Sequence, residues 1–304
     1  MDRAALHSVQ GQPGMPPELS ALPQGAAALQ AAAAAMAGEA ETIVEKAACL
    51  RVQVRALAWQ SNFQQATGQR DAAQRLQRQC LAILQDPALA GSDTRLERAI
   101  LSWSMGATVC MADYAQGRER FEESFSLFRA LDHRWGMAWA LNATGTMSMF
   151  LGEYQDARRR IEEGSAIYRA LGFQPGLADS LSRLAEIASL QGRFEEAERL
   201  AREGVATARE AGSRTEFPFT LLDLGEVLEK VGKFPEARSA SQQSLAVYNE
   251  LGHRDYITET HWRLSSIDLH LGRYEEARDH AQTGLALAHE HGPPDCVGKS
   301  LLLP

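Results

Sequence analysis

Cysteine is scarce in this chain and forms no metal-binding pattern. The 304 residues include four cysteines, Cys49, Cys80, Cys110 and Cys296, and none belongs to a CxxC pair. This scatter excludes a zinc knuckle and a dense disulfide framework, because both need closely spaced sulfur atoms. It predicts reduced thiols and a cytoplasmic location.

Long apolar runs are also missing. The most apolar stretch, GAAALQAAAAAMAG, falls short of the roughly 20 residues that cross a bilayer. No membrane contact is therefore expected, and a short cap helix is predicted from about Gln24 to Met36. Residues 1–23 are rich in Pro, Gly and Gln and lack the apolar core of a secretory signal. We expect a disordered N-terminal tail there.

Positive charge is not in excess. The chain has 31 Lys and Arg against 39 Asp and Glu, which gives a formal net charge of −8. Direct nucleic-acid binding relies on clustered Lys and Arg that displace counterions from phosphates. We therefore expect no nucleic-acid partner.

Catalytic and cofactor motifs do not occur. The sequence contains no HExxH, GxSxG or CxxC, and its Glu-Glu pairs recur with the repeat described below, as structural residues do. Six of the eight histidines lie between His253 and His291 without an i, i+3 or i, i+4 pair, so solvated residues near helix ends are predicted rather than a metal site. We expect no enzyme activity, no catalytic residues, no cofactor and no metal.

The segment GPPDCVGKS, at 292–300, superficially resembles a phosphate-binding loop. Five residues separate Gly292 from Gly298, whereas that loop requires four, and no run of β-branched residues precedes it to form the usual strand. The segment is interpreted as a turn between repeats. ATP hydrolysis that is abolished by Lys299→Ala would contradict this interpretation.

A period of forty residues dominates the rest of the sequence. Stacking at that interval aligns LGEYQDA, QGRFEEA, VGKFPEA and LGRYEEA, each with a glycine, an aromatic residue and an alanine in fixed places. The members are Gly152, Tyr154 and Ala157; Gly192, Phe194 and Ala197; Gly232, Phe234 and Ala237; and Gly272, Tyr274 and Ala277. A second series of glycines consists of Gly172, Gly212, Gly252 and Gly292.

The period predicts pairs of helices. A glycine that ends an apolar-periodic helix supplies its left-handed C-terminal residue, so two glycines per unit indicate two helices and two turns. Apolar residues between the glycines recur at i, i+3, i+4 and i+7, and no stretch alternates with period two. With weaker upstream copies, one displaced by four extra residues in QDPALAGSDT, the prediction is six helix pairs from Arg51 to Gly292.

These residues resemble the tetratricopeptide repeat over roughly residues 51–292. Small residues at the eighth position of the first helix complete the pattern, at Gly145, Ala185, Gly225 and Ser265. The forty-residue units ending in ALG look like those in the sensor regions of bacterial STAND-class, LuxR-type transcriptional regulators. The resemblance implies an all-α fold, a right-handed superhelical α-solenoid of stacked antiparallel helix pairs whose first helices line a concave groove.

The resemblance also implies which residues face the groove. Aromatic anchors beside a mixed-charge strip would suit a bound peptide. Large aromatics also fill gaps between helices, so of the five tryptophans only Trp139 and Trp262 are assigned to the groove. The expected partner-binding residues are Trp139, Asn142, Thr146, Phe150, Asp179, Ser182, Arg183, Glu186, Phe219, Asp223, Glu226, Trp262, Arg263 and His270.

The leading hypothesis is a non-catalytic module that binds a protein or peptide in this groove, as the sensor or scaffold part of a bacterial regulatory system. One alternative is a region that senses a small molecule or sugar, which a closed aromatic-lined pocket between first helices would favour. Another is a fragment of a larger STAND ATPase or signalling enzyme. The expected domains are the tail at 1–23, a solenoid at 24–292 and the start of a truncated repeat at 293–304. The apolar SLLLP there predicts truncation, or docking on a partner or a second copy.

Overall fold

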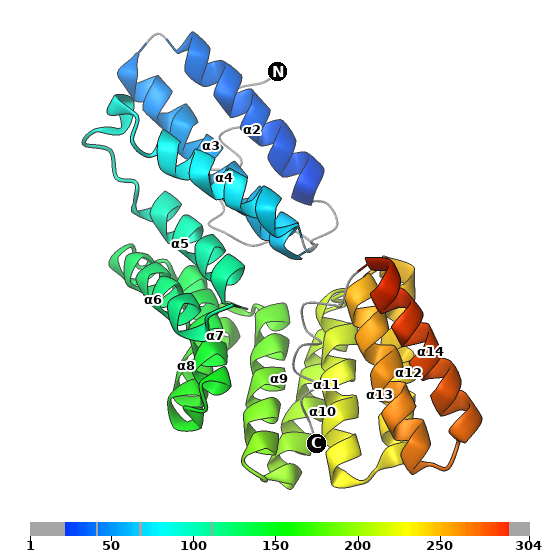
Figure 1. The fold of residues 1–304 in the computed structure, drawn as a ribbon. Helices are drawn as coiled ribbons and strands as arrows, with labels where there is room; N and C mark the ends of the chain where they lie inside the picture. The colour runs from blue at the N-terminus through cyan, green and yellow to red at the C-terminus, as the bar shows by residue number, and fades with distance from the viewer. Residues whose placement is uncertain (1–21, 41, 67–68, 111, 292–304) are drawn as a thin grey trace. The chain divides into compact units, whose positions relative to one another are not determined.

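The computed structural model describes residues 22–40, 42–66, 69–110 and 112–291 (Figure 1). Residues 1–21 of the expected tail lie outside these ranges, and residues 22 and 23 open the first helix. The segment from 292 to 304, with the glycine-lysine-serine turn and the expected start of a further repeat, also lies outside the described residues.

Every long element in the described part of the chain is a helix, and no strand occurs there. A cap helix, α2 (Leu22–Glu39), precedes six helix pairs, as the sequence predicts. The pairs are α3 (Ile43–Ala66) with α4 (Arg70–Ile83), α5 (Arg95–Val109) with α6 (Tyr114–Ala130), α7 (Arg134–Phe150) with α8 (Tyr154–Leu171), α9 (Gln174–Leu190) with α10 (Phe194–Glu210), α11 (Glu216–Val231) with α12 (Phe234–Leu251), and α13 (Arg254–His270) with α14 (Tyr274–His291).

The helices belong to two compact units, Met1–Ile167 and Tyr168–Pro304, whose boundary falls inside α8. In the first unit, consecutive helices from α2 to α7 pack against one another, and α3 also contacts α5. In the second unit, consecutive helices from α9 to α14 do the same, and α11 contacts both α9 and α13. Within each unit the pairs therefore stack in sequence order, as expected for an α-solenoid.

The glycines of the repeat have the predicted backbone conformation. Gly192 and Gly212 follow α9 and α10 with φ angles of 73° and 63°, a left-handed conformation that residues with a Cβ rarely adopt. The other described members of both glycine series share it. After α6 the corresponding place is taken by Asp132, with a φ of 50°.

The alanine that follows each aromatic residue lies at a close helix contact. Ala157, Ala197 and Ala237 are completely buried, as their small size predicts. A Cβ added to Gly145 would lie only 3.0 Å from the carbonyl oxygen of Ala157. Small side chains on both helices thus allow α7 and α8 to approach closely.

The first helix pair starts earlier than predicted. The prediction placed its start at Arg51, but α3 begins at Ile43, because residues 43–50 include no glycine or proline that would end a helix and α2 packs along α3. The insertion in QDPALAGSDT contains a short 3-10 helix, η1 (Pro87–Leu89). Asp86 caps it by accepting a hydrogen bond from the Ala88 N–H at 2.8 Å.

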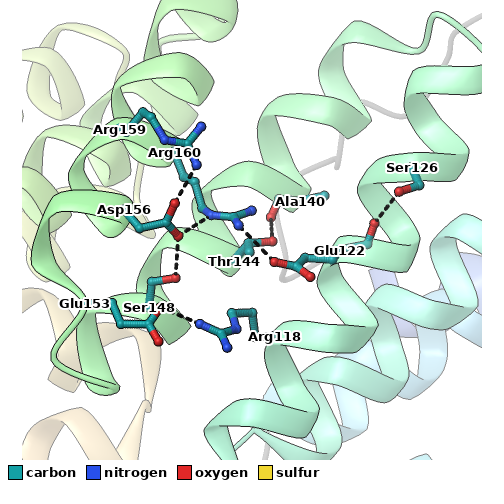
Figure 2. A network of polar contacts seen from close by, with 10 residues as sticks. All are labelled: Arg118, Glu122, Ser126, Ala140, Thr144, Ser148, Glu153, Asp156, Arg159 and Arg160. Carbon is teal, nitrogen blue, oxygen red and sulfur yellow. Dashed lines mark hydrogen bonds and ion pairs between the residues drawn. The ribbon is translucent and has the colours of Figure 1, made fainter.

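A polar network links α6, α7 and α8 in the first unit (Figure 2). Arg160 of α8 donates from Nη2 to Oε1 of Glu122 on α6 at 2.9 Å, and it also pairs with Asp156. Asp156 accepts a hydrogen bond from Ser148 of α7 at 3.0 Å. Glu122 belongs to one of the recurring Glu-Glu pairs, so at this position the pair has a structural role.

Candidate functional site

Half-exposed residues of α9, α11 and α13 line up at i, i+4 and i+7 in the second unit. Most residues between them are buried, because each first helix packs against its own second helix and against neighbouring helices. We name this half-exposed set the first-helix strip. Its members are Asp179, Arg183 and Glu186 of α9, Phe219, Asp223, Glu226 and Glu229 of α11, and Glu259, Arg263 and Ser266 of α13.

Contacts across the strip connect the three helices. The guanidinium of Arg183 lies over the ring of Phe219 at 4.7 Å from its centroid, which joins α9 to α11. The Phe219 ring meets Tyr256 of α13 edge-on at a centroid distance of 6.2 Å. Arg263 of α13 reaches back to Glu226 with Nη2 2.8 Å from Oε2. The structure therefore brings together four of the residues expected in the groove.

Carboxylates outnumber cations along the strip. Its acidic members are Asp179, Glu186, Asp223, Glu226, Glu229 and Glu259, and its basic members are Arg183 and Arg263. Burial alone would raise the pKa of Glu226, but Arg263 and Lys230 lower that pKa to about 2. Glu226 is therefore ionised at neutral pH.

Asp223 differs from the other strip carboxylates. Its Oδ2 atom is buried and accepts no hydrogen bond. Burial, opposed by the charge of Arg183, raises the pKa of Asp223 to about 8. Near pH 7 most molecules therefore carry a neutral carboxyl group at this position.

Two residues expected in the groove, Asn142 and Ser182, are placed inside the helix pairs instead, and a third, Trp262, is half-buried. Asn142 and Ser182 are 4% and 0% exposed, and the Trp262 ring lies 2.4 Å from where a Cβ on Gly284 would be. Each stands at the fifth position of a first helix and faces a glycine of the second helix, Gly164, Gly204 or Gly284. The assignment of Asn142 and Ser182 to the groove is corrected, because the missing side chain on the second helix makes room for them within the pair. A groove contact of Trp262 stays a prediction.

Trp139 lies in a cluster of tryptophans in the first unit. Its ring stacks on Trp103 at 3.8 Å and lies 5.3 Å from Trp59 and 5.1 Å from Trp135. The four half-buried rings come from α3, α5 and α7, and those of Trp59, Trp103 and Trp139 also pack against the buried core of the unit. Gap filling between first helices accounts for this cluster, and a partner contact of Trp139 stays a prediction.

Of the remaining expected residues, Thr146 and Phe150 belong to α7 in the first unit, and His270 belongs to α13 in the second. Thr146 is half-buried and donates its hydroxyl to a backbone carbonyl of its own helix. The ring of Phe150 packs at 5.1 Å from that of Tyr114. His270 is exposed at the end of α13 and stacks on Phe234 at 4.6 Å.

One pair of histidines was missed by the sequence argument, which expected solvated side chains. His261 of α13 and His280 of α14 are half-buried, with their Nδ1 atoms 2.9 Å apart. His280 Nε2 lies 3.7 Å from Oδ2 of the fully buried Asp268. Arg238 donates a hydrogen bond from Nε to Oδ1 of the same aspartate at 2.6 Å. Spacing within one helix could not reveal the pair because it forms between two helices.

Acidification is expected to destabilise the last helix pair. Burial, with the nearby His280, lowers the pKa of His261 to about 4. The unfolded chain, with a His pKa of about 6.5, therefore binds more protons than the folded one, and stability falls by about 2–3 kcal/mol as pH drops from about 6.5 to about 4. His261→Leu places at this position the residue type that Leu221 has at the same position of the preceding repeat. The variant should lose much less stability on acidification.

Urea unfolding at neutral and acidic pH, followed by far-UV circular dichroism, measures this effect. His289→Leu changes an exposed histidine of α14 and is the matched control. A His261→Leu protein that loses as much stability on acidification as the control would contradict the assignment.

Other site types find little support in the described part of the chain. A crevice of about 350 Å³ lies among α10, α11 and α12, lined by Arg202, Arg209 and Leu224 among others, without aromatic residues. It is not the aromatic pocket between first helices that would favour small-molecule sensing. Among the described residues, no group of three or more His, Cys, Asp or Glu could hold a metal ion. No helix within the described ranges is long and apolar enough to cross a membrane.

Comparison with known proteins agrees with the repeat architecture. A family model described as tetratricopeptide repeat matches residues 136–210 and 217–290. No curated protein sequence matches the chain.

Several solved structures share the fold. A Rap protein complexed with competence and sporulation factor is 10% identical, with a TM-score of 0.67 over 88% of this chain and 77% of that one. NprR in complex with its cognate peptide NprX is 13% identical, with a TM-score of 0.61 over 83% and 71%. Aspartyl phosphate phosphatase F from Bacillus subtilis is 11% identical, with a TM-score of 0.55 over 78% and 71%. At such identities the likeness concerns the fold alone.

Proposed function

We propose that this chain, a member of the tetratricopeptide-repeat family, binds a peptide segment of a partner protein along the first-helix strip, as the non-catalytic sensor or scaffold part of a regulatory system. The observation that carries the proposal is the continuity of the strip. Half-exposed aromatic and charged side chains, linked from α9 through α11 to α13, form one surface.

The chemistry of the strip suits an extended peptide. Phe219 offers an apolar contact, and the charged groups on either side can orient polar side chains and backbone amides. The many ion pairs within the strip hold these side chains in place before binding, which reduces the entropy lost on association. The solved NprR structure contains a cognate peptide, and our proposal extends that type of ligand to this chain.

A random peptide library displayed on phage and selected against the purified chain tests the proposal. Selected peptides are synthesised, and their affinities are measured by fluorescence anisotropy. We expect Arg183→Ala and Glu186→Gln to weaken binding by about tenfold, because each removes a charge-assisted contact of about 1.4 kcal/mol or more.

The matched controls are Arg199→Ala and Glu203→Gln, which break an exposed ion pair on the second helix α10. These should change affinity less than about twofold, since exposed pairs contribute little. Far-UV circular dichroism verifies that each variant is folded. Equal losses in strip and control variants, or a library that yields no binding peptide, would refute binding along the strip.

A further inference from the structure

We infer that the first-helix strip recognises a cationic side chain of its peptide, arginine or lysine, at Asp223. This inference rests on the proposed function and adds the chemistry of the ligand. It selects one class of peptide from those that an α-solenoid surface could accept.

Charge complementarity is the first argument. The six strip carboxylates exceed the two strip arginines, and those arginines are already paired. Arg183 Nη1 lies 2.9 Å from Glu186, and Arg263 Nη2 lies 2.8 Å from Glu226. The surface that remains is acidic, so it favours a positive group on the partner.

Asp223 is the strip carboxyl group with an oxygen, Oδ2, to which no neighbour donates a hydrogen bond. The charged and titratable groups that face it are Arg183 and Glu186 from α9, Glu226 from its own α11, Arg263 from α13 and Tyr248 from α12. None of them donates a hydrogen bond to Oδ2 of Asp223. A carboxyl oxygen without a donor is costly, and a guanidinium or ammonium group of a ligand, placed against the exposed part of Asp223, would stabilise its ionised form.

The aromatic neighbours support the same ligand. Phe219 precedes Asp223 by one helical turn, and its ring already accepts the guanidinium of Arg183 at 4.7 Å. Tyr256 lies beside it, 6.2 Å from ring to ring. Aromatic faces next to a carboxylate attract cations through the ring quadrupole as well as through charge.

Binding of a cation at this position should release a proton. Asp223 is mostly neutral near pH 7, because burial, opposed by Arg183, raises its pKa to about 8. A cation favours the ionised form, so affinity should increase about tenfold between about pH 7 and about pH 9, as the ionised fraction of the free protein rises. The bound peptide must carry its charge throughout this range, which arginine does.

The probes are the peptides Ac-Ala-Ala-Arg-Ala-Ala-NH2 and its analogue with neutral citrulline in place of arginine. Their dissociation constants are measured on the full chain by ligand-observed NMR at several pH values. We expect the arginine peptide to bind about tenfold more tightly than the citrulline peptide at about pH 9, and its affinity alone to rise with pH. Asp223→Asn should abolish both the preference and the pH dependence.

Asp279→Asn, an exposed change on α14, is the matched control and should behave like the wild type. The inference is overturned if the two pentapeptides bind equally, if the arginine preference survives Asp223→Asn, or if neither binds. Peptides from the phage library that still depend on Arg183 and Glu186 would in those cases leave the proposed function standing. Failure of the library as well would remove both.

Discussion

Replacing Ala237 with aspartate is expected to lower the free energy of unfolding of the second unit by at least ~3 kcal/mol. Ala237 is completely buried, and a Cβ on Gly225 would lie 3.4 Å from its carbonyl oxygen. A carboxylate in this contact between α11 and α12 loses its hydration, and its additional atoms force the two helices apart.

Urea unfolding followed by far-UV circular dichroism and by the fluorescence of Trp262, the tryptophan of the second unit, measures this loss. Ala246→Asp introduces the same charge on an exposed face of α12 and should cost less than about 0.5 kcal/mol. Equal stability of the two variants would show that the packing register assigned to the repeat is wrong.

The second large effect is expected at a buried carboxylate in the first unit. Glu97 of α5 is 0% exposed and pairs with two arginines of α3, Arg51 at 3.1 Å and Arg55 at 3.7 Å. Changing both arginines to methionine leaves the charge buried without a cation. We expect the free energy of unfolding to fall by about 3 kcal/mol, because removing only the cationic partners of a buried ion pair leaves an uncompensated charge.

Adding Glu97→Leu to that variant should restore most of the stability, because an apolar set of similar volume can replace a buried ion pair at little cost. Arg120→Met, which breaks an exposed pair with Glu123, should cost less than about 1 kcal/mol. Four of the five tryptophans, Trp59, Trp103, Trp135 and Trp139, lie in the first unit, so fluorescence in urea reports its unfolding. A triple variant no more stable than the double one would refute the electrostatic explanation.

The helix pairs could be predicted from the sequence because their determinants are local. Gly192 and Gly212 end helices through their own φ angles, and Ala197 marks a close contact by its size alone. Such signals repeat every forty residues, so each copy supports the others. The start of α3 at Ile43 was missed because no residue of that kind stands there.

The candidate site was predictable only in part. The family resemblance assigned Arg183, Phe219 and Arg263 to one surface, and the structure places them among the half-exposed residues of three first helices. The resemblance could not tell that Ser182, one residue from Arg183, turns into the pair toward Gly204. That orientation depends on how closely two helices approach, which is a property of the pair and not of one helix.

The sequence by itself determined that this protein is a series of helix pairs, with a turn at each glycine and a close contact at each alanine, because backbone conformation and side-chain size act within a few residues. The tertiary structure alone decided which polar residues meet: Asp223 beside two paired arginines, and His261 against His280. The charge state of these groups depends on burial and on neighbours that lie on other helices.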